Sequence, residues 1–136
     1  MVNRKIEDVE GIGPVIGGKL RDNGVKDTDA LLAQAKTPAL RKALAEKTGL
    51  TPKQVLKFAN MVDLYRISGV GSEYAELLEK AGVDTVVELA RRKADALAAK
   101  MLEVNQAKKL TRRPPTQADV AKWIEQAKAL PRALEY

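Results

Sequence analysis

Gly11-Ile12-Gly13-Pro14 is the stretch from which the fold of this chain can be predicted. Two glycines around an aliphatic residue allow positive φ angles and the close approach of another chain, which is typical of a tight turn. Pro14 favours the first position of a helix, because the N–H that proline lacks would have no partner there. We therefore expect a helix from Pro14 to about Asn23, with Gly24 just past its end. The amides of residues 15–17 would point out of the helix start and could receive an anion.

The same turn recurs at Gly69-Val70-Gly71-Ser72, at an offset of 58 residues from the first. One such turn would mean little, but the matches continue in register through the following helix. The offset also relates Leu20 to Leu78, Gly24 to Gly82, Val25 to Val83 and Leu31 to Leu89. Two copies in register predict an internal repeat, which we place at residues 3–66 and 67–130.

Helix signals fill the rest of both copies. Residues 3–10 predict a short first helix, and further starts are expected at Asp27 or Thr28, at Thr37-Pro38 and at Thr51 with Gln54. An apolar stripe at helical spacing then faces a core in each copy: Val55, Phe58, Ala59 and Val62 in the first, and Val120, Trp123, Ile124 and Ala127 in the second. The sequence therefore predicts an all-α fold, a single compact domain over residues 1–136 made of two pseudo-symmetric repeats with about eight to ten short helices.

On these two turns the sequence resembles the tandem helix-hairpin-helix families of DNA repair, recombination and polymerase proteins. Over nearly its whole length it is also similar to an uncharacterised bacterial family of unknown function built from two such motifs. The resemblance implies a helical module that grips the nucleic-acid backbone, and it permits a potassium or sodium ion on the hairpin carbonyls. It implies no established activity. The base-excision glycosylases that share the hairpin place a catalytic lysine just after the turn or an aspartate further downstream in a larger fold, whereas here Pro14, Val15 and Ile16 follow Gly13.

Positive charge is concentrated in one segment. Residues 91–113 contain eight Lys and Arg side chains and two acidic ones, Asp95 and Glu103. The net charge of this segment, 8 − 2 = +6, equals that of the whole chain. Most charge runs are solvated helix faces, and the alanines among residues 94–99 favour that interpretation for the helical part. Residues 108–113 differ, because four of the six are cationic and Pro114-Pro115 follow. Since the two prolines cannot continue a helix, we expect an exposed basic loop there.

The sequence contains no cysteine and no histidine. Their absence removes disulfides, thiolate metal sites and the commonest general bases. The acidic residues form no metal-type cluster, so we expect no enzyme activity, no catalytic residue, no metal site and no cofactor beyond the permitted monovalent ion. No apolar run approaches the roughly 20 residues that a membrane helix needs, and no signal-type core follows the first residues. We expect a cytoplasmic protein that does not contact a membrane.

These features favour non-catalytic, sequence-non-specific binding of the nucleic-acid backbone, with duplex DNA as the expected partner. The second turn is expected to bind more weakly, because Glu73 places a carboxylate at the second helical position, where it repels an anion. The expected contacts come from the first turn with its helix and from the basic loop: Gly11, Ile12, Gly13, Val15, Ile16, Gly17, Lys19, Arg21, Lys108, Lys109, Arg112 and Arg113, with Gly69, Val70 and Gly71 as the weaker site.

A second function stays open, namely a protein-interaction or scaffold module in which the paired hairpins form a helical platform. The acidic second turn and the lack of net charge outside residues 91–113 favour it. Salt dependence separates the two functions, since phosphate binding weakens steeply as ionic strength rises. The sequence does not determine the oligomeric state.

Overall fold

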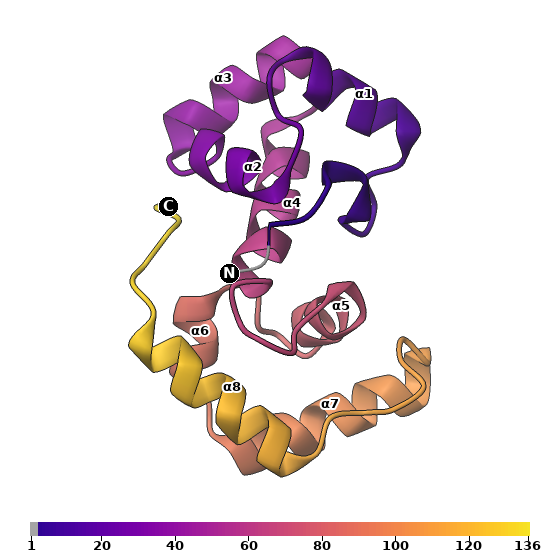
Figure 1. Cartoon of the computed structure of the whole chain (residues 1–136). Coiled ribbons are helices and arrows are strands. Elements are labelled where there is room, and N and C mark those ends of the chain that lie inside the picture. The colour runs from indigo at the N-terminus through magenta and orange to yellow at the C-terminus, as the bar shows by residue number, and fades with distance from the viewer. Residues whose placement is uncertain (1–2) are drawn as a thin grey trace. The chain divides into compact units, whose positions relative to one another are not determined.

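The computed structural model of the chain describes residues 3–136 (Figure 1). Over this range the fold is all-helical, as the sequence predicts, and its β structure is one isolated bridge between Lys5 and Asp27. The elements are the 3-10 helix η1 (Ile6–Asp8) and the α-helices α1 (Pro14–Asp22), α2 (Thr28–Gln34), α3 (Pro38–Thr48), α4 (Pro52–Leu64), α5 (Ser72–Lys80), α6 (Val86–Ala90), α7 (Ala94–Lys108) and α8 (Gln117–Ala129).

The described residues form two compact units. The N-terminal unit comprises residues 3–63 and 132–136, and the C-terminal unit comprises residues 64–131. The boundary after Asp63 lies close to the expected repeat boundary between residues 66 and 67. Each unit therefore contains one of the two glycine turns, which we call the first turn (residues 11–13) and the second turn (residues 69–71).

The N-terminal unit begins with less helix than the sequence predicts for residues 3–10, because only Ile6–Asp8 are helical and these form a 3-10 turn. The preceding residues pair with the segment before α2 instead. The Thr28 amide donates to the Arg4 carbonyl at 2.9 Å, and the Ile6 amide donates to the Lys26 carbonyl at 3.1 Å. A backbone that makes these long-range hydrogen bonds is extended and cannot also make helical ones.

The helix starts of this unit follow the capping residues that the sequence contains. Asp27 caps α2 by accepting from the Ala30 amide, and Thr37 caps α3, with Pro38 at its first position. Thr51 and Gln54 form a reciprocal capping box at the start of α4, with distances of 2.9 and 3.1 Å. Each such cap stabilises a helix by about 1 kcal/mol, because it satisfies an amide that has no partner within the helix.

The expected core stripe of α4 is buried. Val55, Phe58, Ala59 and Val62 are at most 6% exposed. Other buried side chains of this unit come from η1, α1, α2 and the loops beside them, among them Ile6, Val9, Leu20, Val25 and Leu31. Burying a large aliphatic or aromatic side chain contributes roughly 1.5–3 kcal/mol, so this stripe is a main source of the unit's stability.

Residues 132–136 complete the N-terminal unit. Leu134 is 2% exposed, and the Glu135 backbone is held from both sides. Its amide donates to the Lys36 carbonyl at 2.8 Å, and its carbonyl accepts from the Arg41 guanidinium at 2.7 Å. The Tyr136 ring lies 5.6 Å from the same guanidinium. The end of the described chain is therefore part of the fold, although nothing in its sequence pattern indicated that.

The C-terminal unit packs α8 against α6 and α7, and α5 against α7. Thr85 caps α6, and Thr116 forms a capping box with Asp119 at the start of α8. The expected stripe of α8 is buried, with Trp123 5% and Ile124 4% exposed. Trp123 lies against α5, where its ring centroid is 5.2 Å from that of Tyr74.

Candidate functional site

The first glycine of each turn has a backbone that other residues rarely adopt. Gly11 has a φ of 90° and Gly69 a φ of 92°. A Cβ added at Gly11 would lie 3.2 Å from Phe58, and one added at Gly69 would lie 3.2 Å from Trp123. Glycine is therefore required at each position for two reasons: the backbone is left-handed, and an aromatic ring of the core stripe lies close to it.

The second glycine of each turn differs from the expectation that both glycines have positive φ angles. Gly13 has φ −91° and ψ −170°, and Gly71 has φ −100° and ψ −166°. Both are N-cap residues, and an N-cap has an extended backbone because the chain enters the helix from it. A Cβ added at Gly13 would meet nothing within 4 Å. A side chain there would therefore cost little strain and would only block the approach of a ligand.

The helices that follow the two turns begin without a side-chain cap. Most other helices of the described chain are capped by Asp or Thr. The expected set of available amides is smaller than residues 15–17, because the Gly17 amide donates to the Gly13 carbonyl at 2.8 Å. The first helix start therefore presents the amides of Val15 and Ile16, together with the positive end of the helix dipole.

Side chains around the first turn divide into buried and exposed ones. Ile12 is 3% exposed and belongs to the core, so it brings no side chain to the surface. Val15 is 73% exposed, and Lys19 is also exposed. The accessible surface at the first turn and the start of α1 thus includes backbone, the exposed side chains of Pro14, Val15 and Lys19, and the half-buried Ile16.

Arg21 is already paired with a carboxylate of its own unit. Its Nε donates to Glu7 Oε2 at 2.7 Å and its Nη2 donates to Glu7 Oε1 at 2.5 Å. These hydrogen bonds lower the pKa of Glu7 to about 2 and raise that of Arg21. The same carboxylate covers Gly17, where an added Cβ would lie 2.6 Å from Glu7 Oε2. The expectation that the first helix start has no competing carboxylate is therefore wrong, because a residue 14 positions away in sequence supplies one.

The second turn is fixed by side chains of its own unit. Val70 is 2% exposed, so this turn also presents backbone at the surface. The Gln126 side chain accepts from the Ser68 amide at 2.8 Å and donates to the Ser68 carbonyl at 3.3 Å. The hydroxyls of Tyr65 and Ser72 lie 2.7 Å apart, which ties the first residue of α5 to the residue that follows α4. Glu73 is exposed at the second position of α5.

The basic loop, residues 108–113, has a defined backbone. Helix α7 extends to Lys108, and Lys109 ends it in the left-handed conformation with a φ of 52°. The Asn105 side chain, which is 8% exposed, then bonds the Thr111 backbone twice, at 3.0 and 3.1 Å. This pair of hydrogen bonds satisfies a buried amide and folds the loop back onto the end of α7.

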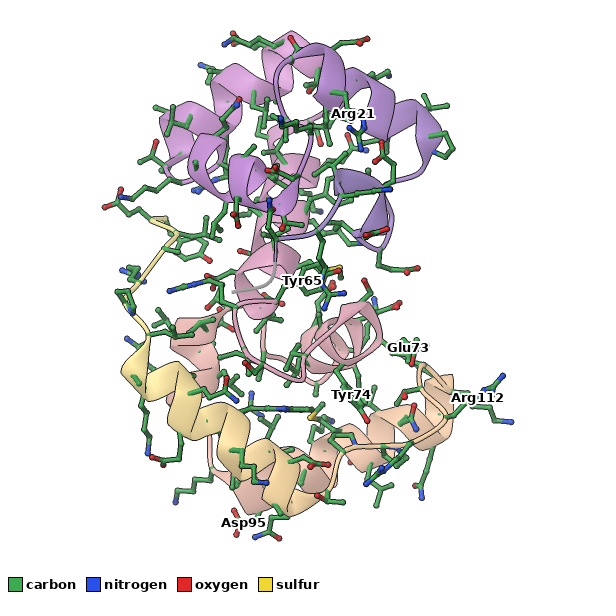
Figure 2. All side chains as sticks on the ribbon, viewed as in Figure 1. Arg21, Tyr65, Glu73, Tyr74, Asp95 and Arg112 are labelled. Atoms are coloured by element: carbon green, nitrogen blue, oxygen red, sulfur yellow. The ribbon has the colours of Figure 1, made fainter. Side chains whose placement is uncertain are left out.

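The basic loop is also attached to the helix that follows the second turn. The Tyr74 hydroxyl, in the first turn of α5, donates to the Arg113 carbonyl at 2.9 Å. Figure 2 labels Glu73, Tyr74 and Arg112 at this end of the C-terminal unit. We expected the loop to act with the first turn, but the structure brings it together with the second helix start.

The four cations of the basic loop, Lys108, Lys109, Arg112 and Arg113, are exposed. The ion pairs of the described chain involve other residues, so none of these four charges is neutralised by a contact with a carboxylate. The charge of Arg113 also acts on Asp119, whose pKa is lowered chiefly by hydrogen bonds from Thr116. The loop is therefore a fixed backbone that presents cations to solvent.

No group of three or more acidic side chains among the described residues is arranged to hold a metal ion. Burial raises the pKa of Asp84, with the charges of Glu88 and Glu79 adding to the effect. Within residues 3–136, none of the helices combines the length and the apolar character needed to cross a membrane.

Three side chains that shape these surfaces escaped the sequence analysis: Glu7, Tyr74 and Asn105. Each acts on a residue that is near in space only after folding, and none stands in a recognisable motif. Asn105 had the best signal, because a polar residue within the apolar face of a helix is often buried with a hydrogen-bonding task. Nothing in the sequence marks Glu7 or Tyr74 in a comparable way.

Comparison with known proteins places the chain in a family. No curated protein and no solved structure matches it. Residues 10–130 match a family described as Domain of unknown function (DUF4332), a range that includes both glycine turns and the basic loop. The resemblance to a family of unknown function is thereby confirmed, and the chain belongs to the DUF4332 family.

Proposed function

We propose that this protein binds the phosphate backbone of nucleic acid, with duplex DNA as the partner, without catalysis and without sequence preference. The observation that carries the proposal is the basic loop. Its backbone is fixed by Asn105 and Tyr74, while Lys108, Lys109, Arg112 and Arg113 are exposed and make no ion pair within residues 3–136. Phosphate contacts of this kind supply essentially all of the affinity in non-specific binding.

A fixed backbone favours binding because less conformational freedom is lost when the ligand arrives. The loop has three such constraints: the left-handed residue Lys109, the paired hydrogen bonds from Asn105 to Thr111, and the hydrogen bond from Tyr74 to Arg113. The four cationic side chains are exposed to solvent. This combination suits a surface that contacts many equivalent phosphates and reads no bases.

The second turn supports the same proposal, since Tyr74 ties the loop to α5. The start of α5 has no side-chain cap, and its amides and dipole favour an anion. Glu73 opposes this, but the exposed cations of the loop are held beside the same helix. We therefore assign the main contact to the second turn and the basic loop together, a reversal of the order that the sequence favours. Gly69, Val70 and Gly71 would contribute through their backbone.

The first turn is the second contact in the proposal. Its resemblance to a helix-hairpin-helix motif, the open space at Gly13 and the uncapped amides of Val15 and Ile16 support it. Lys19 adds an exposed charge, whereas Arg21 is committed to Glu7. A monovalent ion on the turn carbonyls, which the resemblance permits, is not needed for binding through amides and cations.

The experiment is a salt titration of duplex binding. Replacing Lys108, Lys109, Arg112 and Arg113 by Ala removes up to four phosphate contacts, each of which contributes about −0.9 to the slope of log affinity against log salt. Binding should weaken, and the slope should become less steep. A matched control replaces the same number of exposed lysines on α3 and α4: Lys42, Lys47, Lys53 and Lys57. Equal loss in both variants would show only a general charge effect, and an unchanged loop variant would refute the proposal.

The alternative is a protein-interaction module. The observation that favours it is Val15, a β-branched apolar residue that is 73% exposed beside the open Gly13. In that case a partner would bury Val15, and its affinity would depend little on salt. The alternative would be supported if the protein did not bind duplex DNA at low salt and if the Val15→Ser variant no longer bound a protein partner.

A further inference from the structure

A second cationic surface lies in the N-terminal unit, on residues that flank the first turn in sequence. It is an open depression of about 320 Å³ lined by Asn3, Arg4, Lys5, Arg21, Lys26 and Asp27. Four of the six lining side chains are cationic and one is a carboxylate. The volume falls at the lower end of the range for small-molecule sites, so a compact ligand would fit.

The base of the depression is rigid. The Arg4 carbonyl accepts from the Thr28 amide at 2.9 Å, and the Arg4 amide donates to the Thr28 hydroxyl at 3.0 Å. The Asn3 side chain completes this pairing by accepting from the Asp29 amide at 3.1 Å and from the Thr28 hydroxyl at 3.2 Å. The two segments that carry the cations are therefore held side by side before any ligand binds.

The carboxylates near the depression are both engaged. Asp27 Oδ1 accepts from the Ala30 amide at 2.8 Å, and Asp27 Oδ2 accepts from the Asn3 side chain at 3.2 Å. These two hydrogen bonds, in that order, lower the pKa of Asp27. Glu7 holds the Arg21 guanidinium through Nε and Nη2, which fixes the plane of the fork.

The lysines differ from the carboxylates. Lys5 and Lys26 are exposed, and neither makes an ion pair within the described residues. They stand on the two paired segments. Arg21 lines the same depression, but its charge is already balanced by Glu7. Several cations around one small concavity suit a ligand that carries more than one negative charge on one group, which a phosphate monoester does and a single carboxylate does not.

We propose that this depression binds the phosphate group of a phosphomonoester, with Lys5 and Lys26 as the charge-neutralising residues. The inference does not depend on the proposed function of the basic loop, since it uses residues of the N-terminal unit alone. A free sugar phosphate and the 5′-phosphorylated end of a nucleic-acid strand both carry this group.

The first test is a titration with ribose 5-phosphate at low salt, followed by backbone amide chemical shifts. Shifts should be largest for residues 4–6 and 26–28, and the same residues should respond to inorganic phosphate. Replacing Lys5 and Lys26 by Gln should weaken binding by about two- to fivefold for each lysine, the scale of single exposed charges. The matched control, Lys42→Gln with Lys57→Gln, should bind as the unmodified protein does.

The remaining arms distinguish the sources of the phosphate and separate this site from the basic loop. A 5′-phosphorylated oligonucleotide that binds more tightly than its 5′-hydroxyl counterpart, with the difference lost in the Lys5/Lys26 variant, identifies the strand end. Ribose 5-phosphate binding without that difference identifies a free ligand. The basic-loop quadruple variant should retain both behaviours. Absence of shifts at residues 4–6 and 26–28, or equal weakening in the control variant, would overturn the inference.

Discussion

The first and second turns have nearly the same backbone conformation but different electrostatic environments. Gly11 and Gly69 agree within a few degrees in φ, and each accommodates an aromatic ring at the same distance. Around the first turn, a carboxylate from η1 covers α1 and neutralises Arg21. Around the second, exposed cations are tied to α5 through Tyr74. A shared turn therefore does not imply a shared ligand, because distant residues decide the charge at each helix start.

The two glycines within a turn have different roles. The first glycine is required by backbone conformation and packing, so its role is structural. The second is extended, and at Gly13 the space beside it is open, so its lack of a side chain matters mainly for what approaches from outside. The two roles can be broken independently by substitution.

The largest expected effect tests the packing that both turns share. Phe58→Ala and Trp123→Ala each remove a buried ring that lies against the first glycine of a turn. Each should destabilise its unit by about 3–5 kcal/mol, as expected for a large aromatic side chain in a core. Denaturant unfolding followed by circular dichroism measures this, since Trp123 is the only tryptophan and its removal abolishes that fluorescence signal. A loss in only one of the two variants would show that the turns are not packed alike.

The next effect separates the two glycines. Gly11→Ala and Gly69→Ala should each cost about 1–2 kcal/mol from the left-handed backbone alone, and more if the ring cannot move. Gly13→Ala should leave the unfolding free energy nearly unchanged, because Gly13 is extended and an added Cβ meets nothing within 4 Å. Thermal unfolding of the three variants measures these differences in stability. If Gly13→Ala were as destabilising as Gly11→Ala, the structural distinction between the glycines would be wrong.

A smaller effect is expected from the exposed carboxylate of the second turn. Glu73→Gln removes a charge at the second position of α5 while keeping nearly the same size. Duplex affinity at low salt should rise modestly, by about 0.3–1 kcal/mol, if phosphate reaches this helix start. The exposed Glu46→Gln on α3 serves as the control for net charge. Equal gains in the two variants would remove the assignment of a phosphate to α5.

The smallest effect concerns the carboxylate of the first turn. The pKa of Glu7 is lowered from 4.5 to about 2 by Arg21, so folding holds this carboxylate ionised. The resulting stabilisation is complete above about pH 4.5 and is lost as the pH falls towards 2. Glu7→Gln should therefore reduce stability relative to the unmodified protein at pH 6, with the difference shrinking between pH 4.5 and 2. The difference should also shrink with added salt, because the pair is exposed. A difference independent of pH would mean that Glu7 acts by packing on Gly17.

Much of the local structure could be predicted because its causes are local. Asp27, Thr37 and Thr51 cap helices through amides three residues away, and the helical spacing of the α4 and α8 stripes marks the faces that are buried. The exception is residues 3–10. There the helical pattern of Ile6 and Val9 was outweighed by hydrogen bonds to residues 26–28, a partner that the pattern does not contain.

The sequence by itself determined the all-helical class, the helix starts, the two turns and the exposed basic loop, because each depends on contacts within a few residues. Only the tertiary structure decided the electrostatic environment of each turn. Glu7 meets Arg21 across 14 residues, Tyr74 meets Arg113 across 39, and Arg41 meets the carbonyl of Glu135 across 94. Such pairs form only when packing has already brought their helices together, and no local propensity records which charge will lie beside which helix start.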